Sequence, residues 1–222
     1  TGSELVGLVP LDAIISAGKH YLYKQNAAEG IPENEIVECA VQSLGLSDLS
    51  TFDPTKKIIE YAISEEKNKL VNLRTRDLLD EISIKSPAPG GGSVSALLGS
   101  SGASLCSMVA SLTYYKKEFF DRRKEMNDLG ARAQLLKDKL VRLIDEDTNA
   151  FNAIMVSNRM PSKTEKEAKA KYKAQQNANE RAFEVPFHVA SLCADVVDIS
   201  VPLSINGNPN SISDIGVALE SA

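Results

Sequence analysis

An uncharged segment from Ser86 to Tyr115 constrains this chain more than any other feature. It opens on Ser-Pro-Ala-Pro-Gly-Gly-Gly-Ser, where Pro87 and Pro89 keep the residues before them extended, so that no helix can run through them. Residues 94–112 then combine small and apolar side chains, which is typical of a helix that is buried on most sides. The sequence therefore predicts a tight turn that opens the central helix of a bundle.

The glycines of this turn offer a place where a ligand can meet bare backbone. Gly90, Gly91 and Gly92 permit positive φ and leave no side chain in the way of a second molecule. Ser93 is expected to cap the helix, with the amides behind it facing a carboxylate or another polar group. A loop that only reverses the chain explains the same residues, and local chemistry does not decide between the two. A Walker phosphate loop is excluded, because no Gly-Lys-Ser/Thr sequence follows at the required spacing.

The composition favours a globular protein without nucleic-acid partners. Its 222 residues, 25% of them charged, suffice for one domain plus a fragment and for a buried core. A net charge of −5 argues against binding dominated by nucleic-acid phosphates. Cys39, Cys106 and Cys193 lie far apart among apolar neighbours, so neither a disulfide framework nor a zinc site is indicated.

Neither a targeting segment nor a membrane span is expected. Residues 1–9 lack the basic region and long apolar run of a signal peptide, which predicts a cytoplasmic protein. The uncharged segment is long enough to cross a bilayer. Its many serines and glycines lower its hydropathy below that of a typical span, so a helix inside a soluble bundle is the better interpretation.

The chain divides into two parts at a charged, glycine-free run. Residues 1–63 are expected to form the first part and residues 71–222 the second, with 64–70 as the linker. The chain stops at Ala222 inside the last predicted helix and without a cap, which predicts that the second part is truncated at its C-terminus.

The first part is predicted to mix strand and helix. Residues 5–9 form an apolar strand that stops at Pro10, and one strand cannot close a sheet. This part is therefore expected to be the end of a larger α/β domain. Its helices are predicted over 11–23, over 32–44 with an end near Gly45, and over 56–63 behind the cap and first-turn proline at Asp53-Pro54.

The second part is helical throughout and predicts an α-helical bundle. Glu165 with Lys169 and Glu167 with Lys171 are spaced as i, i+4 pairs, which marks a helix with one solvated face. Pro186 is expected to kink or restart that helix. The helices of this part are predicted over 73–82 with Asn72 as the cap, over 94–112, over 121–159 up to a break at Met160-Pro161, and over 164–185 with a continuation through Leu192.

Asp147 is the strongest candidate for chemistry. It interrupts an apolar helix face whose members are spaced by four and three residues, namely Leu136, Leu140, Leu143, Phe151 and Ile154. A carboxylate there needs hydrogen bonds, and burial would raise its pKa towards the range useful for proton transfer. The alternative is an aspartate that pairs with an arginine or caps a neighbouring helix. Asp145 and Glu146 point elsewhere and are expected to be solvated.

Two further polar segments have both a structural and a functional interpretation. In the segment 207–214, Ser211 and Asp214 have the spacing of a capping box, whereas Asn208 and Asn210 suit the donor and acceptor edges of a heterocycle. The basic run that begins at Lys116 and Lys117 is either a solvated helix junction or a site for an anionic tail.

These motifs together resemble the formimidoyltetrahydrofolate cyclodeaminase family. The resemblance is carried by the glycine turn at 86–93, Thr-Tyr-Tyr-Lys-Lys at 113–117, Leu-Ile-Asp-Glu-Asp at 143–147 with Ala150-Phe151, Arg-Met-Pro at 159–161, and Gly-Asn-Pro-Asn at 207–210 with Ser213-Asp214. Residues 1–10 and Lys-Ile-Ile-Glu-Tyr at 57–61 resemble the C-terminal end of glutamate formimidoyltransferase. In this order the motifs match the bifunctional formimidoyltransferase-cyclodeaminase family over essentially the whole chain.

The resemblance implies an ammonia-lyase of histidine degradation. Such an enzyme converts 5-formimidoyltetrahydrofolate into 5,10-methenyltetrahydrofolate and ammonia. Asp147 matches the family's catalytic aspartate and would act as general acid and base, because the amine must be protonated to leave. No metal or redox cofactor is implied, since the folate derivative is itself the substrate.

The same resemblance implies a folate pocket and an oligomer. The residues expected to line the pocket are Pro89, Gly90, Gly91, Gly92, Ser93, Gly207, Asn208, Asn210, Ser213 and Asp214. Lys116 and Lys117 are candidates for a glutamate or polyglutamate tail. Family members form dimers with sites near subunit contacts, which predicts a homodimer or a higher homo-oligomer. Transferase activity is not expected from this chain alone, because it lacks the region that holds the catalytic histidine of that activity.

Two other functions remain open at this point. One is a non-catalytic helical fragment that associates with partner helices through faces left apolar by missing C-terminal helices. The other is a methenyltetrahydrofolate cyclohydrolase on the same fold, which would hydrolyse the methenyl bridge. The transferase-like opening argues against the cyclohydrolase, because it ties the chain to formimidoyl chemistry.

Overall fold

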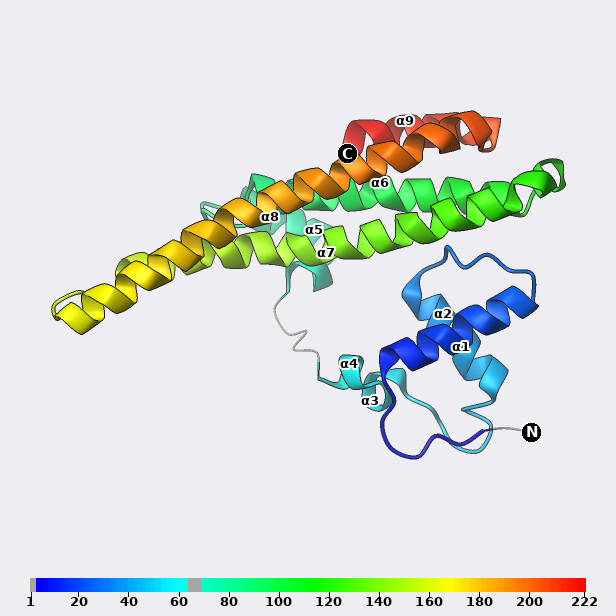
Figure 1. The fold of residues 1–222 in the computed structure, drawn as a ribbon, viewed down its shortest axis with the longest axis horizontal. Helices are drawn as coiled ribbons and strands as arrows, with labels where there is room; N and C mark the ends of the chain where they lie inside the picture. Colours follow the sequence, from blue (N-terminus) through cyan, green and yellow to red (C-terminus); the bar gives the residue numbers. More distant parts are fainter. Residues whose placement is uncertain (1–2, 64–68) are drawn as a thin grey trace.

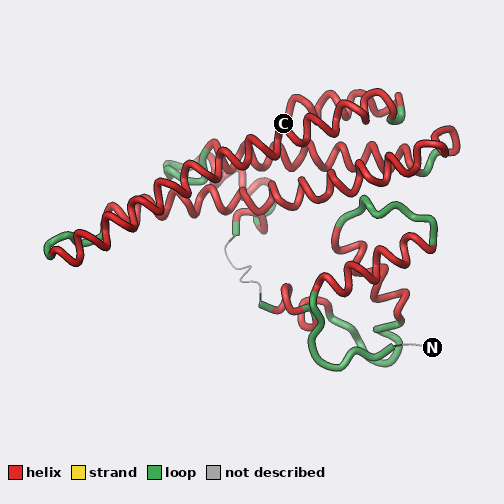
Figure 2. The backbone as a smooth tube through the Cα atoms, viewed as in Figure 1, coloured by secondary structure: helices red, strands yellow, loops and turns green. Residues whose placement is uncertain are grey.

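The computed structural model describes residues 3–63 and 69–222, and helices make up most of both ranges (Figures 1 and 2). In chain order these are α1 (Leu11–Lys24), α2 (Glu33–Leu44), α3 (Pro54–Lys57), α4 (Ile59–Ala62), α5 (Thr75–Ser83), α6 (Gly91–Tyr114), α7 (Arg123–Arg159), α8 (Glu165–Asn206) and α9 (Ile212–Ser221). Short 3₁₀ helices occupy Leu70–Asn72, Lys117–Arg122 and Pro209–Ser211. The predicted helical bundle is confirmed.

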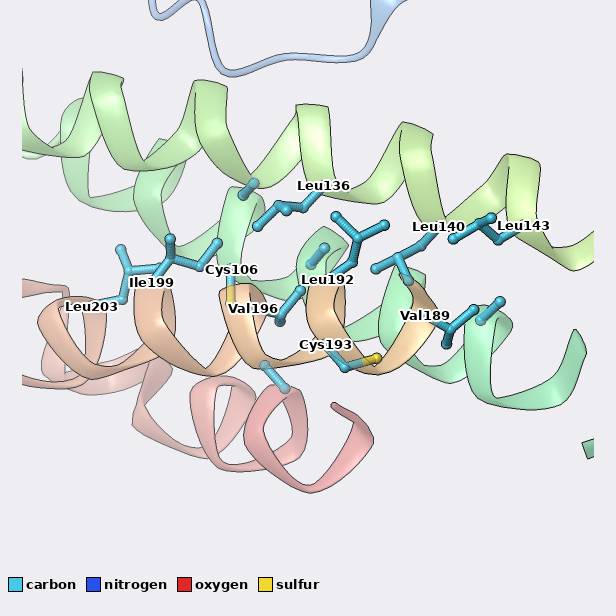
Figure 3. Close-up of a cluster of buried hydrophobic side chains, with 14 of the residues drawn as sticks. Cys106, Leu136, Leu140, Leu143, Val189, Leu192, Cys193, Val196, Ile199 and Leu203 are labelled. Carbon is cyan, nitrogen blue, oxygen red and sulfur yellow. The ribbon is translucent and has the colours of Figure 1, made fainter. Parts of the chain in front are cut away.

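The bundle is built around α6, which contacts α7, α8 and α9. Figure 1 shows α6, α7 and α8 extending along the long axis of the molecule, with α9 folded back on them. The apolar face predicted on residues 121–159 is the face of α7 that packs against α8. Figure 3 shows its buried members Leu136, Leu140 and Leu143 opposite Val189, Leu192, Val196, Ile199 and Leu203 of α8.

Small residues let the neighbouring helices approach α6 closely. A Cβ placed on Gly99 would lie 2.6 Å from the Cys193 sulfur on α8, and one on Gly102 would lie 2.8 Å from the Ala218 carbonyl oxygen on α9. Both separations are too short for a real side chain, so these packing contacts require glycine. The predicted central helix is confirmed and extends three residues further at its start, to Gly91.

Two helices of the described chain, α6 and α8, are long and apolar enough to cross a membrane by length and composition. In the bundle, 56% of the apolar window of α6 and 39% of that of α8 are buried by other parts of the chain. The core helix of a bundle passes the same test, so the two helices are weak evidence for a span.

Helix α8 begins and continues for identifiable reasons. Thr164 and Glu167 form a reciprocal capping box, and Lys169 pairs with Glu165 at 2.7 Å as predicted. The prediction that Pro186 restarts the helix was wrong, because α8 runs through both Pro186 and Pro202. A proline removes one helical hydrogen bond. Buried neighbours such as Val185 and Val189 anchor the helix on both sides of that position.

The N-terminal unit, residues 3–63, is helical and has its own small core. Helices α1 and α2 confirm the predicted segments, and Gly45 ends α2 with a positive φ of 63°. Asp53 accepts a hydrogen bond from the Thr55 amide and caps α3, as predicted. The core of the unit consists of Ile14, Val37, Ala40, Leu46, Phe52 and Ile58.

The predicted strand over residues 5–9 was wrong. Gly7 has a φ of +91°, which interrupts an extended segment, and Pro10 already leads into α1. Only Val9 pairs, in an isolated parallel bridge with the fully buried Ile58. The extended conformation of Ile58 that makes this bridge also divides the predicted helix over 56–63 into α3 and α4. The described residues of this unit therefore form no sheet.

The start of the bundle also differs from its prediction. Asn72 ends a 3₁₀ helix and does not cap α5, which begins at Thr75 behind Arg74. The amide of Leu70 instead donates to the Asp145 carboxylate at 2.7 Å, which fixes this segment to α7. Of the predicted linker, residues 64–68 lie outside the described residues.

A loop of the N-terminal unit docks on the bundle through its backbone. The amides of Ala28 and Glu29 donate to the Tyr115 hydroxyl at 3.1 Å and to Asn127 Oδ1 at 2.8 Å, and the Gly30 carbonyl accepts from the Ser107 hydroxyl at 3.1 Å. A Cβ on Gly30 would lie 2.5 Å from the carbonyl carbon of Gly130 on α7. Two backbones thus meet directly at this point.

Gly30→Ala is therefore expected to destabilise the chain, because neither backbone can move out of the way of the new methyl group. We expect a decrease of about 1–3 kcal/mol in the free energy of unfolding, measured by urea denaturation. Gly216→Ala is the matched control, since no atom lies within 4 Å of its added Cβ, and alanine in a helix should leave stability unchanged or raise it by up to about 1 kcal/mol. Equal effects of the two variants would contradict the backbone contact.

Candidate active site

The turn before α6 differs from its prediction in two details. The helix begins at Gly91 with Gly90 as its N-cap, so Ser93 lies inside the first turn and is not the cap. Gly90 has an extended conformation (φ −126°, ψ −158°), and none of the turn glycines has a positive φ. Pro89 is buried in front of the helix, and its bond to Ala88 is cis. Glycine is therefore needed in this turn because another group approaches the backbone closely, and not because the backbone adopts an unusual φ angle.

Asp147 of α7 is the residue that approaches the turn. Its Oδ2 accepts a hydrogen bond of 2.8 Å from the Ser93 amide and lies 3.1 Å from the Ser93 hydroxyl. A Cβ on Gly92 would overlap the Asp147 carboxylate, so only glycine leaves room for it. The first amides of a helix have no partner within the helix and carry its partial positive charge, and both features favour a carboxylate.

The structure thus realises the alternative that Asp147 caps a neighbouring helix. Ser93 strengthens the connection between α6 and α7. The residue is only 2% exposed, and its hydroxyl donates to the Ile144 carbonyl oxygen at 2.8 Å and lies 3.2 Å from the Thr148 hydroxyl. A capping role and a chemical role do not exclude each other, since Asp147 is only half-buried.

The two acidic neighbours of Asp147 have other partners. Asp145 accepts the Leu70 amide, and Glu146 forms an ion pair with Arg181 of α8. Both lie off the face that carries Asp147, as predicted. The expectation that they are simply solvated was wrong for Asp145, whose hydrogen bond is partly buried, whereas the ion pair of Glu146 lies at the surface.

An open pocket of about 570 Å³ lies next to this arrangement. Gly92 lines the pocket and is also the residue that the Asp147 carboxylate approaches from α7, whereas Asp147 itself does not line the cavity. The remaining lining is mostly small and apolar: Ser95, Pro186, Val189, Ala190, Cys193, Ala194, Val197 and Ala222. A cavity of this size with few polar groups is typical of a site for a flat organic ligand.

Sequence reasoning missed the α8 wall of this pocket. The signal was present, since Pro186, Val189, Cys193 and Val197 recur at steps of three and four. Cys193 was expected as a small buried residue, and it is one. Burial raises the pKa of its thiol, so the group stays protonated and contributes shape to the pocket.

A second polar cluster forms where α6 ends. Asn208 is only 8% exposed, and its amide donates to the Thr113 hydroxyl at 2.9 Å. Its Oδ1 accepts from the Lys116 ammonium at 3.1 Å and from the Asn210 amide at 3.2 Å. Gly207 packs against Val109 of α6. Asn208 therefore connects the turn between α8 and α9 to the end of α6.

The other predicted residues of this segment are more exposed. Asn210, Ser213 and Lys117 lie at the surface, and Asp214 is half-buried. The predicted capping box of Ser211 and Asp214 was wrong, because Ser211 makes no side-chain cap bond to α9. Asn208 supplies the cap instead, one short 3₁₀ helix earlier.

Within one chain, the two clusters lie at opposite ends of α6. The glycine turn and Asp147 are at its start, whereas Lys116 and Asn208 are at its end. A helix of 24 residues is about 36 Å long. The residues predicted to line one pocket are therefore divided between two places on each chain.

Among the described residues, no group of three or more His, Cys, Asp or Glu side chains is placed to hold a metal ion. The carboxylates of Asp145 and Asp147 accept backbone amides, and that of Glu146 pairs with an arginine.

Two families match this chain in different places. The family described as Formiminotransferase-cyclodeaminase matches residues 74–222, and the one described as Formiminotransferase domain matches residues 1–64. The Formimidoyltransferase-cyclodeaminase of Mus musculus is 32% identical over 222 residues, and that of Dictyostelium discoideum is 34% identical over 223 residues. Each alignment covers 99% of this chain, but the chain spans only 41% and 40% of these relatives' lengths.

Two shorter proteins are similar to the bundle. A Methenyltetrahydrofolate cyclohydrolase of Methylorubrum extorquens is 35% identical over 144 residues, which are 65% of this chain and 69% of that protein. The crystal structure of formiminotetrahydrofolate cyclodeaminase from Thermotoga maritima superposes with a TM-score of 0.60 at 28% identity, and covers 69% of this chain and 72% of that one.

The contact between Gly92 and Asp147 can be tested with two neighbouring alanines. Gly92→Ala should push the carboxylate off the Ser93 amide, so that hydrogen exchange at this amide becomes faster and stability falls by about 1 kcal/mol, the usual value of a lost cap. Gly91→Ala is the matched control, because its added Cβ meets nothing within 4 Å. Unchanged exchange at Ser93 in Gly92→Ala would contradict the geometry.

Proposed function

The chain belongs to the formiminotransferase-cyclodeaminase family, and on that premise we propose that its bundle is a formimidoyltetrahydrofolate cyclodeaminase. The proposed reaction converts 5-formimidoyltetrahydrofolate into 5,10-methenyltetrahydrofolate and ammonia. The observation that carries the proposal is the Asp147 carboxylate, held on the first turn of α6 beside an apolar pocket. The matching families and the Thermotoga maritima structure support the reaction class.

The reaction requires one group that both takes up and releases a proton. The folate N10 forms a bond to the formimidoyl carbon, and the bond from that carbon to the amine nitrogen then breaks. N10 loses its proton during the attack, and the amine leaves only when it is protonated. An aspartate at the pocket edge would accept the first proton and deliver the second, which is general acid–base catalysis by one residue.

The surroundings of Asp147 suit this role. Its Oδ2 is oriented by the Ser93 amide, and Ser93 is in turn fixed by the Ile144 carbonyl and the Thr148 hydroxyl. The carboxylate is therefore held in one orientation before the substrate arrives, which lowers the entropic cost of the reaction. The first-turn amides of Gly91 and Gly92 have no acceptor within the helix and are available to polar groups of the substrate.

The small residues of α8 would accommodate the folate ring. Ala190, Ala194 and Val197 line a cavity of about 570 Å³, and Cys193 lines it with a neutral thiol. Lys116 lies at the other end of α6, so it would bind the carboxylates of a glutamate tail only in an oligomer in which a second copy brings it to this pocket. The folate derivative is then the substrate, and the reaction needs no further cofactor.

The proposal extends to organisation and location. We assign residues 1–63 to the end of a formimidoyltransferase domain, 64–70 to a linker and 71–222 to the cyclodeaminase. The parent protein would carry both activities, and this chain only the second. A cytoplasmic homo-oligomer that binds reduced folates, without nucleic-acid partners or membrane insertion, is consistent with the net charge of −5 and the pocket.

A second candidate function is hydrolysis of the methenyl bridge. The Methylorubrum extorquens relative, whose printed name is Methenyltetrahydrofolate cyclohydrolase, favours this candidate. The formiminotransferase match at residues 1–64 and the alignments over 99% of the chain favour the cyclodeaminase. The two reactions differ in direction at the same bridge, so one absorbance assay distinguishes them. A non-catalytic fragment would show neither.

Asp147→Asn should abolish most of the activity without unfolding the chain. Asparagine can still accept the Ser93 amide but cannot transfer a proton, so we expect the rate of methenyltetrahydrofolate formation to fall by about 10²–10⁴-fold. The measurement is the rise of methenyltetrahydrofolate absorbance after addition of 5-formimidoyltetrahydrofolate. Glu146→Gln is the matched control, because it removes only an exposed ion pair one residue away and should retain activity.

The outcomes separate the candidates. Equal rates for Asp147→Asn and the unchanged chain would reject Asp147 as the acid and base. Loss of absorbance from added methenyltetrahydrofolate, with no ammonia from the formimidoyl substrate, would favour the cyclohydrolase. A folded chain that binds no reduced folate would favour the non-catalytic fragment.

A further inference from the structure

The N-terminal unit and the bundle together form an open pocket of about 430 Å³ that the candidate active site does not use. This volume lies within the range of small-molecule sites, about 300–1,000 Å³. We name the cavity the junction pocket. Its lining comes from the end of α1 and the loop behind it, and from the end of α6 and the start of α7: Tyr23, Lys24, Asn26, Ala27, Glu29, Tyr114, Arg123, Lys124 and Asn127.

Positive charge dominates the lining of the junction pocket. Lys24 comes from α1, and Arg123 and Lys124 come from the start of α7. Glu29 is the one acidic residue among the described residues that line the cavity. Within the ranges 3–63 and 69–222, none of the three cations forms an ion pair with an aspartate or glutamate. Cations that share a cavity and have no carboxylate partner create a potential that attracts an anion.

Arg123 is oriented by its neighbours and keeps donors free. Its Nε donates to the Tyr114 carbonyl oxygen at 3.0 Å. Its guanidinium lies 4.1 Å from the centre of the Phe120 ring and 5.0 Å from that of the Tyr114 ring, so cation–π contacts fix the planar group. No hydrogen bond of the described chain uses its two Nη atoms. These atoms can therefore donate to two oxygens of one phosphate or carboxylate group.

Asn127 adds a neutral donor to the same lining. Its Oδ1 already accepts the Glu29 amide at 2.8 Å, so the group that it has left for a ligand is the Nδ2 amine, which only donates. The loop that supplies this amide turns at Asn26, whose φ is 52°. Asparagine adopts this left-handed conformation more readily than most residues. The junction pocket therefore offers chiefly donors and positive charges to a ligand.

Two tyrosine rings form the aromatic part of the lining. Tyr114 is held in place, because its hydroxyl donates to the Asn26 carbonyl oxygen at 3.3 Å and its ring packs edge-on against Tyr115 at 5.0 Å. Tyr23 is 76% exposed, which leaves most of its ring available for contact. Aromatic rings pack well against other planar groups. The lining thus combines an anion site with surfaces for a flat organic group.

We propose that the junction pocket binds a phosphate monoester whose organic part is a small planar ring system, such as a nucleoside monophosphate. A phosphate monoester carries a charge of about −1.5 to −2 at pH 7. This charge balances three cations opposed by one carboxylate better than the single charge of a monocarboxylate does. The Arg123 guanidinium and the two lysines would bind the phosphate oxygens, and the tyrosine rings would contact the planar part. The site does not depend on the proposed cyclodeaminase activity.

Calorimetric titration of the full chain with adenosine monophosphate tests this proposal. We expect saturable binding, with adenosine and inorganic phosphate each binding at least about tenfold more weakly, because each lacks one half of the contacts. Adenosine that binds as tightly as the monophosphate would show that the cations contribute nothing. Inorganic phosphate that binds as tightly would remove the planar part, and triglutamate that binds as tightly would make the pocket a carboxylate site. Each of these results, and the absence of binding, overturns the proposal.

Single substitutions test whether the ligand occupies this pocket. Lys24→Ala and Lys124→Ala change exposed side chains without ion pairs and should each weaken binding of adenosine monophosphate about tenfold. Arg123→Lys keeps the charge but loses the planar fork, so it should also weaken binding, and its circular dichroism spectrum reports whether the helices stay folded. Lys166→Ala, on the exposed surface of α8, is the matched control and should bind normally. Unchanged affinity in all three pocket variants would place the ligand elsewhere and overturn the proposal.

A ligand in the junction pocket would also join the N-terminal unit to the bundle. Lys24 belongs to the unit and Arg123 to the bundle, so one phosphate would contact both. A ligand that binds only the docked arrangement stabilises it by mass action. The amides of Ala28 and Glu29 make the docking hydrogen bonds, and their hydrogen exchange should become slower when adenosine monophosphate is saturating. Exchange of these two amides that does not respond to the bound ligand would contradict a site between the two parts.

Discussion

The closeness of α6 to its neighbours is the constraint on which the rest of the structure depends. Gly92 admits the Asp147 carboxylate, Gly99 admits the Cys193 sulfur, and Gly102 admits the Ala218 carbonyl. Each contact joins α6 to a different helix, and a side chain at any of them would push that helix away. The pocket follows from the same contacts, because α8 can form its wall only at the distance that these small residues set.

Because α6 is long, the predicted site residues are divided between its two ends. Asp147 and the turn glycines cluster at one end, and Lys116 with Asn208 at the other. Their separation along the helix is large compared with any direct hydrogen bond.

Most helices could be predicted from the sequence, because apolar spacing and end signals are local. The stripe that contains Asp147 is an example, and so is the end of α2 at Gly45. The predictions were wrong where contacts with distant parts of the chain determine the local structure. Ser93 resembles a cap, but a carboxylate from α7 already occupies that place. Residues 5–9 resemble a strand, but among the described residues only Val9 pairs, in a bridge with Ile58. The separation of the two clusters could not be predicted, since no local pattern encodes the distance between segments.

The Asp147 carboxylate at the start of α6 would have two roles that conflict, because it stabilises the helix and would also transfer protons in the proposed reaction. In the unliganded chain Asp147 stabilises the first turn through its negative charge. If it takes up a proton during the proposed reaction, that charge disappears and the turn loses part of its support at the same moment. Each catalytic cycle would thus briefly loosen the segment that orients the catalyst. Selection for a firmer scaffold and selection for faster turnover would therefore act on this one carboxylate in opposite directions.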